Sequence, residues 1–247
     1  MSAPDRTQKG APESGSVLIY ILMAVALFGA LSFAVANIMR SGGGDPNREA
    51  MNLQSTDVLQ YGDALKRSVQ GMRIRSAEDS QISFETPLLP GYAPHTSCTT
   101  NPCRVFHPAG GGISYMPPPA TWLDLTGSTQ PLYGHWFFPA NVCVEAVGTG
   151  TASCNTDTED NEELVVILPW VKRQLCIQIN ERLGILNPGG EPPVATGAAW
   201  SGANTKFTGT FADGTVIARA GASAGCLRGN STPPSNSYFY YKVLLAR

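Results

Sequence analysis

The cysteines are the residues of this chain with the most distinctive chemistry. The sequence contains six of them, and none lies before residue 98. They are Cys98, Cys103, Cys143, Cys154, Cys176 and Cys226. An even number of cysteines confined to one part of a chain is typical of disulfides that form in an oxidising compartment. The sequence does not choose among the pairings, and our working hypothesis joins each cysteine to its nearest neighbour.

The first cysteine pair also has a spacing that a zinc site would use. His95, Cys98, Cys103 and His107 follow one another as H-x2-C-x4-C-x3-H, and histidine and cysteine are the common zinc ligands. In an oxidising compartment a disulfide between Cys98 and Cys103 is the simpler interpretation, because the zinc ligand is the thiolate and an oxidised sulfur no longer provides one.

An acidic run further along the chain offers oxygen ligands for calcium. The alternate residues Asp157, Glu159, Asn161 and Glu163 carry side-chain oxygens, which are the hard ligands that Ca²⁺ prefers. The run lacks the glycine that an EF-hand loop needs at its sixth position. A solvated acidic loop is the alternative, and no cofactor other than this calcium ion is expected.

The remaining polar residues predict no catalytic centre. The sequence has no H-E-x-x-H motif, P-loop or dinucleotide fingerprint. His135 lies in an apolar run, where a histidine is usually structural, and oxidised cysteines supply no nucleophile. The net charge of −2 and the pI near 5.9 argue against general nucleic-acid binding. We therefore expect a protein that is not an enzyme.

A long apolar segment precedes all of the cysteines. No charged residue lies between Ser14 and Met39, and Val17–Met39 is a predominantly apolar run of 23 residues. A helix of this length spans about 35 Å, enough for a hydrocarbon core of about 30 Å. We expect a transmembrane helix, with a secretory signal cut before Asn37 as an alternative. The cysteines then place the C-terminal region outside the cytoplasm.

The residues in front of this segment carry a family signature. Glu13-Ser14-Gly15 is followed by Ser16-Val17-Leu18-Ile19-Tyr20, which resembles the class III signal of type IV prepilins and type II secretion pseudopilins. The resemblance implies that a prepilin peptidase removes residues 1–15 and methylates the new N-terminus at Ser16. It also implies that the apolar helix, residues 16–40, is retained as a filament core. Gly29 matches a glycine that many pilins carry in this helix.

Tyr20 departs from the family pattern. It stands fifth after the expected cut, where the family usually has a glutamate that neutralises the terminal amine of a neighbouring subunit inside the bilayer. A tyrosine carries no such charge, and charge inside a bilayer is costly. Some minor subunits also lack this glutamate, so the resemblance implies a minor or tip subunit.

A helix break and an amphipathic helix follow the apolar segment. Residues 41–47 combine three glycines with a proline and predict a flexible break. Residues 48–80 predict a helix with one apolar stripe, which packs against the head. A stalk or coiled-coil helix is the alternative. The stripe consists of Met51, Val58, Leu65 and Met72, with Tyr61 and Val69 beside them.

Residues 81–247 predict a β-rich extracytoplasmic head with one short helix. Glu163–Leu168 and Tyr238–Leu245 are the clearest strands, and the helix after Pro169-Trp170 should stop at Gly184. Further strands are expected at Gln81–Leu89, Tyr133–Phe138 and Asn141–Val147, and a hairpin from Lys206–Phe211 and Thr215–Ala218. The predicted fold class is α+β, a long N-terminal membrane helix with a disulfide-stapled, mainly antiparallel, pilin-like β head.

These features together predict a pilin-like structural subunit of a type IV pilus or a type II secretion-like filament. The expected partners are other pilin-like subunits, prepilin peptidase and an inner-membrane assembly platform, and no nucleic acid. The expected location is the inner membrane, crossed once, with the head in the periplasm or on a cell-surface filament. The alternative is a single-span, membrane-anchored binding or adhesion domain with no filament role.

Overall fold

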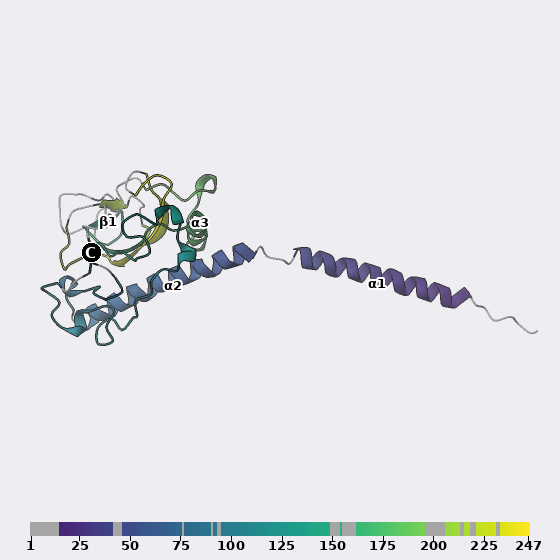
Figure 1. Cartoon of the computed structure of the whole chain (residues 1–247), viewed down its shortest axis with the longest axis horizontal. Helices are drawn as coiled ribbons and strands as arrows, with labels where there is room; N and C mark the ends of the chain where they lie inside the picture. Colours follow the sequence, from purple (N-terminus) through teal and green to yellow (C-terminus); the bar gives the residue numbers. More distant parts are fainter. Residues whose placement is uncertain are drawn as a thin grey trace, which may run out of the picture. The chain divides into compact units, whose positions relative to one another are not determined.

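The chain divides into two compact units, Met1–Glu49 and Ala50–Arg247 (Figure 1). The structure is a computed structural model. It describes residues 15–41, 46–75, 77–89, 91–92, 95–148, 154, 162–195, 206–212, 215–217, 221–230 and 233–247.

Helix α1 (Gly15–Ser41) forms from the apolar segment. It is free of proline and rich in alanine, leucine and methionine, which are strong helix formers. Its stretch Val17–Asn37 has a mean hydropathy of 2.5 and none of it is buried. By length and composition, this helix can cross a membrane.

Helix α2 (Pro46–Ile74) buries its apolar stripe in the head, along one side of which it lies in Figure 1. The helix ends at Ile74, before the predicted residue 80. The next residue, Arg75, donates side-chain hydrogen bonds to the carbonyl of Gly71 in the last turn and to that of Gly110. The buried residues of the stripe are Val58, Tyr61, Leu65, Val69 and Met72, and Met51 is partly buried.

An antiparallel sheet forms the centre of the head. Its strands are β2 (Leu164–Leu168), β5 (Tyr238–Leu245) and β4 (Ala224–Arg228), in the order β2-β5-β4. Every residue of β2 and β5 is buried, as expected from two apolar runs without polar alternation. The sequence did not predict β4, because the run AGCLR has no strand pattern of its own.

The two faces of this sheet contact different hydrophobic clusters. Leu168 and Tyr240 pair across β2 and β5 and face the cluster that contains the α2 stripe. Ile167 and Tyr241 are the neighbouring pair, and they face a second cluster with Phe137. The alternation of side chains along a strand produces this division, since successive residues point to opposite faces.

A second, two-stranded sheet corrects the predicted hairpin. Strand β1 (Val142–Val144) pairs in parallel with β3 (Thr215–Ile217), and Lys206 instead forms an isolated bridge with Pro139. The hairpin prediction is therefore wrong, although its turn residues 213–214 lie outside the described ranges. The head thus combines one antiparallel sheet with one parallel pair.

Two other predicted strands are replaced by irregular structure. Within Gln81–Leu89, Ser83 forms an isolated bridge with Arg104, and within Tyr133–Phe138, Phe137 bridges Ile167. These apolar residues are buried through aromatic contacts rather than in a ladder, as when Phe84 stacks on Phe138 with ring centroids 4.0 Å apart. Of the predicted strand at Asn141–Val147, only Val142–Val144 forms a strand, β1. Single-turn 3₁₀ helices lie at Asp79–Gln81, Asn101–Cys103, Ala120–Trp122, Leu125–Gly127 and Pro188–Gly190.

Helix α3 (Arg173–Arg182) ends just before Gly184, the predicted stop. Gly184 adopts φ 70°, and its N–H donates to the Glu181 carbonyl at 3.2 Å. The next N–H, that of Ile185, donates to the Asn180 carbonyl at 2.8 Å. This is the Schellman motif, which requires a residue that tolerates the left-handed region. Val171, Leu175 and Ile179 are buried, whereas Leu183 is exposed.

Asn180 joins α3 to the outer edge of the antiparallel sheet. Its amide nitrogen donates to the Cys226 carbonyl at 2.8 Å, and its amide oxygen accepts the Cys226 N–H at 2.9 Å. The side chain is fully buried. The Asn180 amide therefore takes the place of a neighbouring strand at this point of β4.

The rest of the sheet edges are covered by irregular segments. On β4, Arg228 exchanges backbone hydrogen bonds with Pro193 and Ala195, both at 2.8 Å. On β2, Ile167 and Phe137 exchange two hydrogen bonds of 2.7 and 2.8 Å, and Val165 donates to the Pro139 carbonyl. An uncovered edge invites another strand, and the outer edges of β2 and β4 are occupied at these positions.

The three disulfides join nearest neighbours, as the working hypothesis expected. They are Cys98–Cys103, Cys143–Cys154 and Cys176–Cys226, with Cα–Cα distances of 5.6, 5.8 and 5.3 Å. The third lies beside Asn180 and links α3 covalently to β4.

Removing the disulfides should have graded effects on stability. The Cys98–Cys103 bond spans a sequence separation of 5 and the Cys176–Cys226 bond one of 50. The loop-closure entropy predicts a loss in the free energy of unfolding of about 2 kcal/mol for the short loop and about 4 kcal/mol for the long one. Chemical unfolding of the two double-alanine variants in detergent measures this difference, and equal losses would contradict the entropic account.

Asn180→Ala should destabilise the head strongly. The substitution leaves the N–H and C=O of Cys226 without the Asn180 amide in a buried environment, which should lower the free energy of unfolding by about 2–4 kcal/mol. Gln178→Ala is the matched control on the same helix, because its amide donates only to Glu181 at the surface, and it should cost less than about 0.5 kcal/mol. Urea unfolding of both variants measures the difference, and similar losses would contradict the role of Asn180.

Candidate functional site

The surface of α1 is the largest apolar feature among the described residues. Its big side chains are exposed by fractions between 43% at Val35 and 72% at Phe28. Gly29 has no neighbouring atom within 4 Å of where a Cβ would stand. The helix satisfies its own backbone hydrogen bonds, so its surface suits lipid or other apolar helices.

Tyr20 and Gly15 occupy the start of this helix. Gly15 is its first residue, and Tyr20 is 69% exposed on its surface. Residues 1–14 and the Ser16 side chain lie outside the described part of the chain, so the cleavage prediction at Gly15–Ser16 stays a prediction. The described helix has no acidic residue in its first turn.

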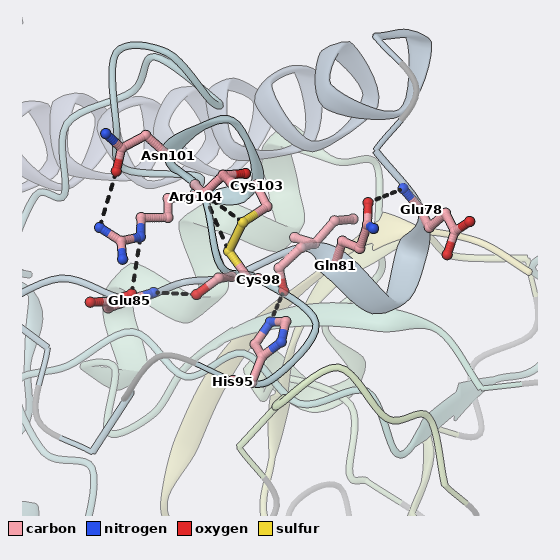
Figure 2. Close-up of a disulfide and its surroundings, with 11 residues drawn as sticks. Glu78, Gln81, Glu85, His95, Cys98, Asn101, Cys103 and Arg104 are labelled. Atoms are coloured by element: carbon pink, nitrogen blue, oxygen red, sulfur yellow. Dashed lines mark hydrogen bonds and ion pairs between the residues drawn. A yellow bond between two sulfur atoms is a disulfide. The ribbon is translucent and has the colours of Figure 1, made fainter.

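The Cys98–Cys103 disulfide excludes the zinc interpretation of its motif. Both sulfurs are oxidised, His95 Nε2 lies 2.9 Å from the Ile82 carbonyl oxygen, and His107 Nδ1 accepts the Ala109 N–H at 3.1 Å. Figure 2 shows the disulfide with His95 on one side of it. Across the described residues, no group of three or more His, Cys, Asp or Glu side chains is placed to hold a metal ion.

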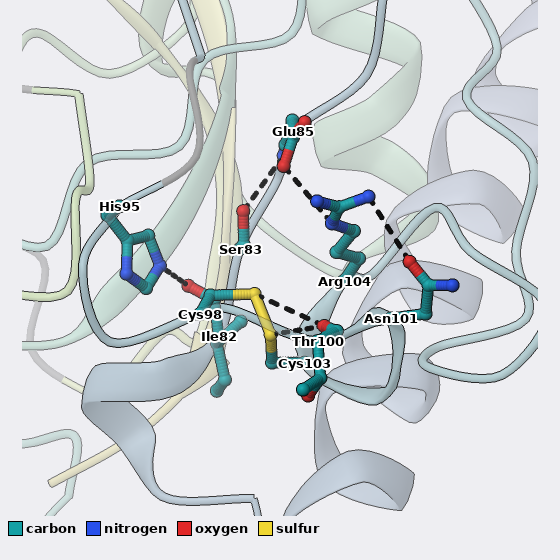
Figure 3. A network of polar contacts seen from close by, with 9 residues as sticks. All are labelled: Ile82, Ser83, Glu85, His95, Cys98, Thr100, Asn101, Cys103 and Arg104. Carbon is teal, nitrogen blue, oxygen red and sulfur yellow. Dashed lines mark hydrogen bonds and ion pairs between the residues drawn. A yellow bond between two sulfur atoms is a disulfide. The ribbon is translucent and has the colours of Figure 1, made fainter.

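The disulfide closes a short polar loop, and Arg104 links this loop to the neighbouring segment of the head. Arg104 forms an ion pair with Glu85 at 3.1 Å and donates to the Asn101 side chain at 3.2 Å (Figure 3). The backbone N–H of Glu85 donates to Ser83 Oγ at 3.3 Å. Residues 99–102 are exposed within this frame. The arrangement presents a rigid surface loop and offers no free thiol for chemistry.

Glu163 is the one member of the predicted calcium set that lies in the described residues. Asp157, Glu159 and Asn161 lie outside them, so the calcium prediction stays untested. The Glu163 carboxylate is fully buried and accepts the Val144 N–H at 2.7 Å, and its backbone bridges Val142. Glu163 therefore belongs to the junction of β1 and β2 and not to a solvated loop.

Burial raises the pKa of the Glu163 carboxyl to about 7. The Val144 hydrogen bond opposes this rise, and the adjacent Glu162 adds to it. A raised pKa means that the folded state binds a proton more tightly than the unfolded chain does. Stability is therefore greatest below the ordinary glutamate pKa and decreases as the pH rises through about 7.

Glu163→Gln should remove this pH dependence. At pH 8 the variant should be more stable than the wild type by about 2–3 kcal/mol, because the neutral amide avoids the burial of a charge. Below pH 4 the two proteins should have similar stability, since both side chains are then neutral. Thermal or urea unfolding across this pH range measures the difference, with the exposed Glu181→Gln as control. A pH profile unchanged from that of the wild type would contradict the assignment.

A G-x-S-x-G sequence is present at Gly221–Gly225, although it does not build a nucleophile elbow. That motif needs a strand followed by a helix. Here Ser223 is exposed and leads into strand β4, and its carbonyl accepts the Val243 N–H at 2.8 Å. The described hydrogen bonds of the three histidines do not involve Ser223.

Sequence reasoning missed two groups of residues that the fold brings together. Asn180 is a polar residue one turn after Cys176, on the inward side of its helix. A polar residue at an inward position was the one sequence signal that could have indicated a buried hydrogen bond. His135 was interpreted as structural, yet it lines a pocket with Lys206 and Tyr92. No sequence pattern connects these three residues.

Comparisons with known proteins find no match: no family model, no curated protein and no solved structure is similar to this chain.

Proposed function

We propose that this chain is a pilin-like structural subunit, assembled through its apolar N-terminal helix into a type IV pilus or a type II secretion-like filament. The observation that carries the proposal is the contrast between two consecutive helices. α2 buries its apolar stripe in the head, whereas Val17–Asn37 of α1 exposes large apolar side chains in every direction. α1 therefore offers an apolar surface that suits lipid or other apolar helices.

Such a helix can move from the lipid bilayer into a bundle of apolar helices at little cost. All backbone groups in the middle of α1 bond within the helix, so neither environment leaves them unsatisfied. Lipid tails are about as apolar as leucine side chains, so association is driven by packing and not by the hydrophobic effect. Gly29 provides a point at which another helix can approach closely.

Two further observations support the proposed location and position. All three disulfides lie in the unit Ala50–Arg247, which fits a head in the periplasm or on the cell surface. Tyr20 carries no charge at the position where the family usually has a glutamate, which favours a minor or tip subunit. The proposed partners are other pilin-like subunits, prepilin peptidase and an inner-membrane assembly platform.

Gly15→Ala tests the proposal at its first step. The variant should block removal of residues 1–15, so intact mass and N-terminal peptide spectrometry of membrane-extracted protein should find the full leader. The wild type should start at a methylated Ser16 and should appear in the sheared surface-filament fraction. Gly10→Ala is the matched control within the leader and should be processed normally.

Other starting points of the native chain would contradict the proposal in distinct ways. A start near Met1 with an unaffected Gly15→Ala variant would indicate a single-span anchored binding domain. A start near Asn37 would indicate a secreted protein.

A further inference from the structure

The turn that follows helix α3 carries two large apolar side chains on the surface of the head. Leu186 is 81% exposed and Leu183 is 36% exposed. Single exposed leucines are normal on a protein surface. These two differ because they lie close together at the end of one helix, on a turn whose backbone is fixed by hydrogen bonds.

The turn holds Leu186 outward between two anchored residues. Before it, the Ile185 N–H donates to the Asn180 carbonyl at 2.8 Å. The Ile185 side chain lies over β4, where its Cδ1 atom would be 3.2 Å from a Cβ placed on Gly225. After it, Asn187 Oδ1 accepts a hydrogen bond from the Asn180 amide at 2.9 Å. The exposure of Leu186 is therefore set by a rigid turn.

Arg182 joins this turn to the beginning of α2. Its Nε donates to Ser55 Oγ at 2.7 Å, and its Nη2 donates to the Asn52 carbonyl at 3.0 Å. Since α1 ends at Ser41 and α2 begins at Pro46, the chain up to Asn52 can bridge at most about 30 Å. A short length of chain thus connects the end of the apolar helix to the part of the head that carries the two leucines.

A contact at the end of so short a connection can be weak and still be populated. A short linker raises the effective concentration of the group it carries to about the millimolar range. An exposed leucine gains free energy when it leaves water for the apolar boundary of a bilayer. Glu181 and Arg182, beside the leucines, carry opposite charges, so the surface suits a lipid without net charge.

We propose that the turn at residues 183–186 rests on the surface of the bilayer that α1 crosses. Leu183 and Leu186 insert at the boundary between the headgroups and the acyl chains of the lipid. The inference rests on the membrane anchoring in the proposed function and not on filament assembly. The contact gives the head one preferred orientation on the membrane before any other subunit binds.

Spin labels on single introduced cysteines test this contact in the full chain. All six native cysteines are in disulfides, so each label reacts with the introduced thiol. In phosphatidylcholine vesicles, electron paramagnetic resonance measures how often a nitroxide collides with oxygen, which concentrates in lipid, and with a nickel chelate, which stays in water. A high oxygen-to-nickel collision ratio therefore indicates immersion in the bilayer.

Leu186→Cys is compared with Ile74→Cys as a matched control. Ile74 is 85% exposed, and it lies at the other end of α2, about 33 Å from Asn52 along the helix. The collision ratio of the label at Leu186→Cys should exceed that at Ile74→Cys by about threefold or more, because only the first inserts into lipid. A label at Ala26→Cys in α1 measures the anchoring separately and should have a high ratio.

A second set of variants tests whether the leucines hold the turn on the lipid. The label is placed on Pro188→Cys, an exposed position just after Leu186. The double substitution Leu183→Ser and Leu186→Ser should lower the collision ratio of this label to about that of the Ile74→Cys label. Leu125→Ser is the control, because Leu125 is 72% exposed outside this turn, and it should leave the ratio unchanged.

The outcomes separate this inference from the anchoring on which it rests. Equal ratios at Leu186→Cys and Ile74→Cys, with the Ala26→Cys label in lipid, would overturn the contact and leave the anchoring intact. A water-exposed label at Ala26→Cys would overturn both. A ratio at Pro188→Cys that the double serine substitution does not change would also overturn the contact, since the leucines would not be holding the turn on the lipid.

Discussion

The burial of strand β5 on both faces and along both edges is the constraint on which the head depends. Eight consecutive buried residues need cover in four directions. The α2 stripe and α3 cover one face, a second cluster around Phe137 covers the other, and β2 and β4 pair with the edges. Lys242 is the charged residue in this strand, and it remains tolerable because Asp63 of α2 pairs with it at 2.5 Å. The position of α2 is thereby fixed by charge as well as by packing.

The parts of the fold that sequence could predict are those whose signal is local. The α2 stripe repeats at helical spacing, β2 and β5 are continuous apolar runs, and Gly184 ends its helix because of its own conformational freedom. β4 could not be predicted, because the sequence AGCLR becomes a strand only when β5 and Asn180 bond to it. The aromatic segment around Phe84 likewise has strand composition, and it stays irregular because its rings pack on Phe138.

The candidate sites show the same limit. The three disulfides confirm the working hypothesis of sequential pairs, although the cysteine positions alone did not choose among the possible pairings. Glu163 was identified by its side-chain type, but its burial beside Val144 depends on the junction between two strands and inverts the expectation of a solvated ligand. The pocket of Lys206 and His135 was beyond sequence reasoning, because the residues come from separate irregular segments. Irregular backbone has no periodicity from which a side chain's direction can be inferred.

The long disulfide has a mechanical consequence. A folded unit that is pulled from two points of its chain experiences tension, and tension unravels the chain from those points. The Cys176–Cys226 bond bypasses a sequence separation of 50 residues, which as extended chain would be about 170 Å of slack. Under load between α2 and the C-terminal end of β5, the length inside this loop cannot be released. Strands β2 and β5 lie outside the loop, so their hydrogen bonds and packing alone resist the force.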